Sequence, residues 1–138
     1  MVIKEVKEKN SFNINKNNVS EKEQVLELAR KDIIAFGQLF MPEDFMKSTP
    51  APYHYELSDL LLDDTKKRNC IILPRGHSKS TLAKAALMYH LYFNPEGKKE
   101  FIAWVAEEQS QAIDHIKYIQ NHIEMNPALN YYFGDLQG

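Results

Sequence analysis

The sequence predicts an α/β protein in which helices cover a parallel sheet. Two short apolar runs, CIIL at 70–73 and FIAWVA at 101–106, have the length of buried strands and are too short for helices. A segment with helical periodicity follows each run, at 80–93 and at about 109–125. This strand–helix–strand–helix order is typical of parallel sheets. Because sheets average about five or six strands, we expect this sheet to be incomplete in the chain.

The composition of the 138 residues indicates one modest globular domain. With 43% hydrophobic and 11% aromatic residues, the chain is not of the disordered or fibrous class. The formal charge of −2 excludes a strongly basic nucleic-acid-binding protein, although a local basic patch remains compatible with it. The single cysteine, Cys70, excludes a disulfide framework and a multi-cysteine zinc site and fits a reducing compartment. Without a signal-peptide pattern or an apolar run near ~20 residues, the chain is expected neither to be secreted nor to span a membrane.

The first elements are predicted to be helical. Residues 1–19 hold four lysines, two glutamates and few apolar residues, which indicates a flexible polar arm. Ser20 and Glu23 then have capping-box spacing, which predicts the start of a helix. Gly37 predicts the end of this helix or a kink, and the proline-containing segment 41–52 is a connector. The apolar stripe of this helix consists of Val25, Leu26, Ala29, Ile33, Phe36 and Phe40.

A second helix is predicted from Tyr53 to about Asp64, with Pro52 in its first turn. Its end, LLLDD at 60–64, has the apolar-then-acidic pattern of a catalytic strand in an ATPase. Because these leucines continue the apolar face of the helix, we interpret the segment as a helix end. The charged residues 65–69 then form a loop before the first predicted strand.

The stretch from Cys70 to Thr81 carries the pattern of a phosphate-binding site. A predicted strand leads into a short loop with Gly76, and the loop places Lys79 and Ser80 at the start of a helix. Backbone N–H groups and the positive end of a helix dipole attract phosphate. A lysine there reaches the terminal phosphate oxygens, and a serine hydroxyl ligates Mg²⁺. The alternative is an ordinary strand-to-helix turn with an N-cap serine.

The strict pattern G-x-x-x-x-G-K-[ST] is not met, because its glycine positions hold Leu73 and Ser78. A serine at the second position must either avoid the backbone conformation that favours glycine or accept a modest strain. We therefore expect phosphate binding to be weaker than in a loop with both glycines.

The octapeptide Pro74-Arg75-Gly76-His77-Ser78-Lys79-Ser80-Thr81 resembles the variant Walker A loop of bacteriophage large terminase subunits, the ATPases that pump DNA into procapsids. The segment PYHYEL at 52–57 resembles the adenine-binding segment of that family. Residues 104–112 resemble the strand and helix that follow the loop, and 126–134 resemble the helix exit. The resemblance spans about residues 33–136.

The resemblance implies a P-loop NTPase-type parallel sheet with flanking helices, and 51–138 would be the first half of this ATPase domain. The N-terminal helix and connector at 20–50 would precede it. The implied cofactors are ATP and Mg²⁺. All eight residues of the octapeptide would bind ATP, with Mg²⁺ on Ser80, and the base would lie between Tyr53 and His54.

Two loop residues are catalytic by the same resemblance. Lys79 would act on the terminal phosphate, and Arg75 would sense or stabilise charge on the γ-phosphate. Without the resemblance, the alternative interpretation of Arg75 is an exposed loop arginine that pairs with an acidic neighbour. His54 stands where the family usually has glutamine, and an imidazole offers fewer contacts to the adenine edge, so we expect looser base selectivity.

The resemblance also implies partners and a location. The partners are double-stranded viral DNA, the portal protein, the small terminase subunit, other copies of the chain in a ring motor, and a C-terminal ATPase and nuclease polypeptide. The expected location is the host cytoplasm, transiently at the procapsid portal. No membrane partner is expected.

Two alternatives stay open: a helicase-like P-loop ATPase fragment, and a non-hydrolysing nucleotide-binding or structural module. The missing Asp-Glu pair and Ser78 favour the second. Glu107 and Glu108 follow a predicted strand, but the first acid is not aspartate, so we interpret them as the start of the next helix. We therefore regard the chain as a truncated product or one piece of a split gene that hydrolyses hardly any ATP alone.

Overall fold

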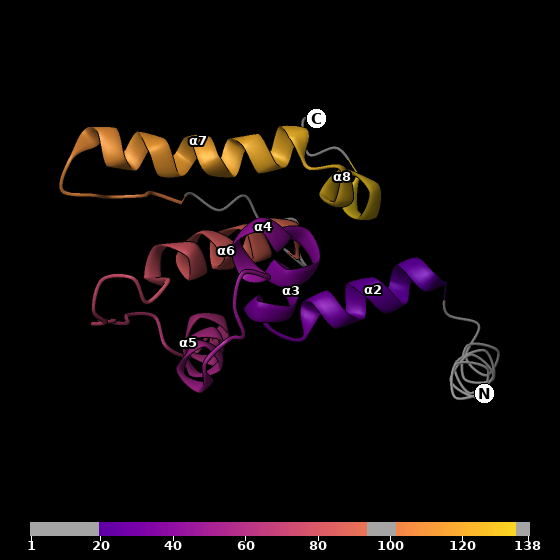
Figure 1. Ribbon diagram of the computed structural model, residues 1–138, viewed down its shortest axis with the longest axis horizontal. Coiled ribbons are helices and arrows are strands. Elements are labelled where there is room, and N and C mark those ends of the chain that lie inside the picture. Colours follow the sequence, from indigo (N-terminus) through magenta and orange to yellow (C-terminus); the bar gives the residue numbers. More distant parts are fainter. Residues whose placement is uncertain (1–19, 94–101, 135–138) are drawn as a thin grey trace.

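The computed structural model describes residues 20–93 and 102–134 (Figure 1). Within these ranges the chain forms helices and no strand, so the predicted P-loop-type parallel sheet is wrong. The arm predicted at 1–19 lies outside the described residues, as do 94–101 and 135–138. The helices are α2 (Glu21–Arg30), α3 (Ile33–Phe40), α4 (Pro42–Phe45), α5 (Pro52–Leu62), α6 (Lys79–Tyr92), α7 (Gln109–Met125) and α8 (Pro127–Phe133).

The helix α6 lies at the centre of the arrangement, with α7 on one side and α3 and α5 on the other (Figure 1). The core that joins these helices is apolar and rich in aromatic rings. Phe36 of α3 packs against Phe40, Tyr89 and Phe93 with ring centroids 5.1, 5.7 and 6.0 Å away. The fully buried large side chains are Phe36, Phe40, Ile33, Met41, Leu82, Met88, Leu129 and Ser58. Helix-on-helix packing therefore buries the apolar surface that a sheet was expected to bury.

The apolar runs at 70–73 and 102–106 have no strand pairing in the described structure. Ile72 and Val105 are each 87% exposed, and Cys70, which was expected in the core, is exposed. A strand is stabilised by hydrogen bonds to a neighbouring strand, and these runs have no such neighbour among the described residues. None of the described residues in the two runs is buried, and the least exposed of them, which include Ile71 and Trp104, are half-buried.

The N-terminal helix begins as predicted but is divided in two. Ser20 Oγ accepts the Glu23 backbone N–H at 3.3 Å, and the Glu23 carboxylate accepts the Ser20 N–H at 3.0 Å, which confirms the capping box. The predicted stripe is then interrupted at Asp32, whose carboxylate caps α3 by accepting the Ala35 N–H at 2.6 Å. Gly37 does not end the helix, because it lies inside α3 against the ring of Phe45.

The helices on either side of the loop have nearly the predicted bounds. Pro52 occupies the first turn of α5, and the helix ends at Leu62, which confirms that the acidic residues after it are a helix end. The start of α6 at Lys79 and the bounds of α7 also agree with the sequence pattern. Ser58 fastens α5 to α3, since its buried hydroxyl accepts the Ile33 N–H at 2.9 Å.

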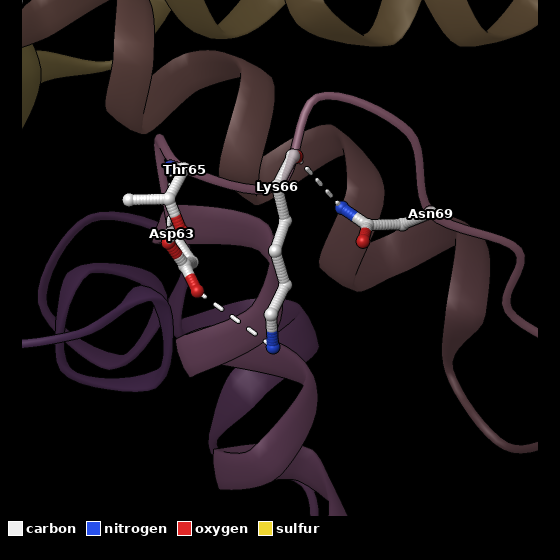
Figure 2. Close-up of polar contacts among 4 residues, drawn as sticks. All are labelled: Asp63, Thr65, Lys66 and Asn69. Atoms are coloured by element: carbon white, nitrogen blue, oxygen red, sulfur yellow. Dashed lines mark hydrogen bonds and ion pairs between the residues drawn. The ribbon is translucent and has the colours of Figure 1, made fainter.

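A polar turn ends α5 and leads into the extended segment before α6 (Figure 2). Asp63 Oδ1 accepts hydrogen bonds from the Thr65 N–H at 3.0 Å and from its hydroxyl at 2.5 Å. The Lys66 ammonium lies 3.7 Å from the same carboxylate, and the Asn69 amide donates to the Lys66 carbonyl at 3.4 Å. The Thr65 contacts, followed by the charge of Lys66, lower the pKa of Asp63. The charged segment 65–69 is therefore a loop, as predicted.

Across the described ranges, none of the helices combines the length and the apolar character that are needed to cross a bilayer.

Candidate phosphate-binding loop

The loop 74–81 enters α6 through two residues with left-handed backbone conformation. Gly76 has φ 79° and Ser78 has φ 60°. Glycine adopts this conformation freely, whereas a residue with a Cβ atom loses about 1–2 kcal/mol. Ser78 therefore accepts the strain at the position where the phosphate-loop pattern has glycine. Such turns point backbone N–H groups in a common direction, which makes them suited to anions.

The first turn of α6 has no side-chain cap. Ser78 is the N-cap residue and its carbonyl accepts the Leu82 N–H at 2.9 Å, but its hydroxyl makes no capping bond. The first turn also holds no acidic residue. Ser78 is therefore an N-cap residue by position but does not cap the helix through its hydroxyl. No side chain among the described residues caps the N–H groups at this helix start, and the positive end of the dipole favours an anionic acceptor there.

The loop carries two exposed cationic side chains and an exposed hydroxyl. The Lys79 ammonium donates to the Leu73 carbonyl and so closes the loop across its base. Arg75 and Ser80 are exposed, and the His77 ring lies 3.1 Å from the Arg75 carbonyl through Nδ1. Among the described residues neither Arg75 nor Lys79 forms an ion pair with a carboxylate. Arg75 can therefore meet an anion directly, whereas Lys79 would first have to leave the Leu73 carbonyl.

The structure brings Tyr53 to the loop. Its ring centroid lies 5.9 Å from that of His77, so the first turn of α5 meets the middle of the loop. Tyr53 also lines a groove of about 510 Å³ together with Leu73 and three acidic side chains of the α5 region. These acidic residues are Glu56, Asp59 and Asp63. An aromatic ring beside apolar and hydrogen-bond-accepting groups suits a base with an exocyclic amine.

His54, the neighbour of Tyr53, faces a different cavity. Its Nδ1 accepts the Ala51 N–H at 2.9 Å, and its Nε2 is buried without a hydrogen-bond partner among the described residues. It lines a cavity of about 40 Å³ that Ser78 and Thr81 of the loop also line. The rings of Tyr53 and His54 lie 4.2 Å apart by their centroids, but the two residues line different cavities.

The cavity next to Lys79 and Ser80 is apolar. It measures about 200 Å³, and its other lining residues are Leu57, Leu61, Ile71, Leu82, Ala83 and Trp104. No carboxylate lines it, so the described residues provide no acid for activating water beside Ser80. Glu107 and Glu108 are exposed, and Glu108 is the N-cap residue of α7, which agrees with their interpretation as the start of a helix.

A magnesium ion on Ser80 would need its other ligands from phosphate and water. No group of three histidine, cysteine or acidic side chains is arranged for a metal within the described ranges. Mg²⁺ bound with a nucleotide takes only one or two protein ligands, alongside phosphate oxygens and waters. The single hydroxyl at the start of α6 fits that chemistry.

A polar cluster between α4, α6 and α7 was not predicted from the sequence. The Tyr118 hydroxyl donates to the Asp44 carboxylate, and the Lys84 ammonium lies 3.9 Å from the centroid of the Tyr118 ring. Burial lowers the pKa of Lys84 and, at the far end of the cluster, that of His122, whose Nδ1 accepts the Asn126 amide at 2.9 Å. Residues 44 and 118 have no common sequence pattern, so only the tertiary structure reveals this cluster.

Comparisons with protein-family models, with curated proteins and with solved structures find no match for this chain. The functional assignment therefore depends on the residues and geometry of the loop.

Proposed function

We propose that the loop 74–81 binds the phosphates of Mg·ATP, and that the chain is the ATP-binding part of a phage large-terminase DNA-packaging motor. The observation that carries the nucleotide site is the start of α6. It has no side-chain cap, it follows left-handed Ser78, and two cations without carboxylate partners flank it. The resemblance of the octapeptide to terminase loops supports the motor assignment. The phosphate site requires only the loop geometry, whereas the sheet that the resemblance implies is not found in the described structure.

Each loop residue has a role that follows from its position. The N–H groups of the first turn of α6 would donate to the phosphate oxygens, and the Lys79 ammonium would leave the Leu73 carbonyl for the terminal phosphate. Ser80 would ligate Mg²⁺ through its hydroxyl. Gly76 allows the chain to approach a phosphate closely, because its missing Cβ faces open space. Arg75 would neutralise charge on the γ-phosphate.

Tyr53 and the acid-lined groove beside it are the best-placed groups for the base. The tyrosine ring provides a stacking surface, and the carboxylates accept hydrogen bonds from an exocyclic amine. An adenine base satisfies both requirements.

Turnover by this chain alone would be very slow. Phosphoryl transfer to water requires a group that orients the water, and the described lining of the cavity beside Ser80 offers no acid. This observation favours, as a second candidate, a non-hydrolysing nucleotide-binding module. In the motor, the missing acids would come from the C-terminal ATPase and nuclease polypeptide. The other proposed partners are viral DNA, the portal protein, the small terminase subunit and further copies in a ring, in the host cytoplasm.

Titration calorimetry with Mg·ATP tests the phosphate site. We expect weak binding to the wild-type chain, and a loss of about ten- to a hundredfold in affinity for Lys79→Ala, because a charged hydrogen bond is worth about 1.5–3 kcal/mol. Lys117→Ala, at an exposed position on α7, is the matched control with the same loss of net charge. It should bind as the wild type does. Equal heats for the wild type and Lys79→Ala would refute the phosphate site.

A further inference from the structure

The tautomer of His54 follows from its one hydrogen bond. A backbone N–H can only donate, so the Nδ1 atom that accepts the Ala51 N–H carries no proton. In the neutral ring the proton therefore resides on Nε2. This Nε2–H group is buried, and no acceptor within the described structure reaches it. A buried donor without a partner destabilises the folded state, so such groups are normally satisfied by protein or by an ordered water.

The cavity beside His54 has the size and chemistry to supply that partner. Its volume of about 40 Å³ exceeds the ~10–15 Å³ that one water needs. Two loop residues with hydroxyl side chains, Ser78 and Thr81, line it from the side of α6. The remaining polar residues of the lining are Ser48 and Asp44, and the Asp44 carboxylate accepts the Tyr118 hydroxyl as one of its hydrogen bonds.

We infer that His54 is a positioning residue of the phosphate loop, which it holds through one bridging water in this cavity. The water accepts the Nε2–H of His54 and donates to the hydroxyl oxygens of Ser78 and Thr81. These three hydrogen bonds are the usual number for a buried water. The link joins the first turn of α5 to the first turn of α6 across the strained residue of the loop.

The inference gives a reason for a serine at the position of the second glycine. Glycine would relieve the backbone strain at Ser78 but would offer no hydroxyl to the cavity. Strained conformations persist only where their surroundings fix them. The water-mediated hydrogen bond from Ser78 to His54 of α5 would fix the strained residue in this way. As far as the inference concerns phosphate binding, it rests on the proposed function. The loop ordering itself is measurable without nucleotide.

Two substitutions test the roles of the two His54 ring nitrogens separately. His54→Asn places its amide oxygen near the former Nδ1 and keeps the acceptor for Ala51, but it removes the donor to the cavity. His54→Gln places its amide nitrogen near the former Nε2, which keeps the donor and removes the acceptor. Without nucleotide, we expect the backbone amide hydrogens of residues 76–81 to exchange about tenfold faster in the His54→Asn variant than in the His54→Gln variant. Equal exchange in these two variants would overturn the inference.

A double substitution tests the path through the water. In a chain with Ser78→Ala and Thr81→Val, the His54→Asn change should no longer accelerate exchange at 76–81, since the water has lost its acceptors. An undiminished effect of His54→Asn in that background would overturn the inference. Nitrogen NMR of His54 reports its tautomer, which packing alone does not determine. We expect a slowly exchanging proton on Nε2 and no proton on Nδ1. The opposite tautomer would overturn it as well.

Binding of Mg·ATP to the same variants separates this inference from the proposed function. If the proposed function holds, His54→Asn should bind about tenfold more weakly than His54→Gln. If neither the wild type nor the variants bind Mg·ATP but the two variants still differ in amide exchange, the proposed function fails and the positioning role stands. If the wild type binds but the two variants exchange alike, the positioning role fails and the proposed function stands.

Discussion

Gly37 lies where a single methyl group has no room. A Cβ atom there would be 2.5 Å from Cγ and Cδ1 of Phe45, which is closer than carbon atoms approach. Gly37→Ala should therefore lower the free energy of unfolding by about 1–2 kcal/mol, because overpacking outweighs the better helix propensity of alanine. Urea denaturation measures the change.

The partner of Gly37 provides the control. In a Phe45→Ala chain, which is itself less stable, Gly37→Ala should cost nothing and can add up to about 1 kcal/mol from helix propensity. The same loss in both backgrounds would show that the cost does not come from the ring of Phe45.

At the scale of elements, local sequence chemistry predicted most helix boundaries. The capping pair Ser20 and Glu23 and the first-turn Pro52 act on neighbouring backbone groups, so their effect is readable without the fold. The division at Asp32 was not predicted, because the apolar stripe continues across it. The role of Gly37 depends on Phe45, which belongs to another helix, and no periodicity within α3 indicates that contact.

The two predicted strands failed for a different physical reason. An apolar run indicates that side chains leave water, but it does not say whether its backbone pairs with a strand or whether helices provide the cover. Ile71 and Trp104 do line the cavity against α5 and α6, while their neighbours Ile72 and Val105 face solvent. The residues of the candidate loop could be named from the sequence because, like the helix caps, they are neighbours along the chain. Their relation to His54 depends on how α5 packs against α6.

The junction of α7 and α8 should be sensitive to acid. Asn126 joins it by donating to His122 Nδ1 at 2.9 Å and to the Phe40 carbonyl at 2.6 Å, while its amide oxygen caps α8. Burial lowers the pKa of His122, although Asp44 and Glu43 act in the opposite direction. The folded state therefore binds this proton less readily than the unfolded state, whose histidine has a pKa of about 6.5. Its contribution to stability is complete above about pH 6.5 and declines as the pH falls toward the lower folded pKa.

His122→Asn tests this pH dependence, since its amide oxygen still accepts from Asn126 but does not titrate. Between pH 7 and pH 5 the urea midpoint of the wild type should fall more than that of the variant. In free energy of unfolding, the extra loss in the wild type should stay below ~1.4 kcal/mol per pH unit, which is the limit for one proton. Parallel pH profiles would assign the acid sensitivity to other groups.

At the scale of the whole molecule, the core lies among α3, α6 and the helices packed on them, and the apolar runs lie at its edge. This arrangement predicts that Ile72→Thr and Val105→Thr each change the free energy of unfolding by less than about 0.5 kcal/mol, as exposed substitutions do. In a covered sheet the same hydroxyls would be buried without partners and would cost about 1–3 kcal/mol each. Met88→Ala, in the fully buried core, is the internal reference and should cost about 2–5 kcal/mol. Urea denaturation of the three variants decides the point: a loss above about 1 kcal/mol at Ile72 or Val105 would mean that this run is covered in solution, and that the helical core is not the whole of the buried structure.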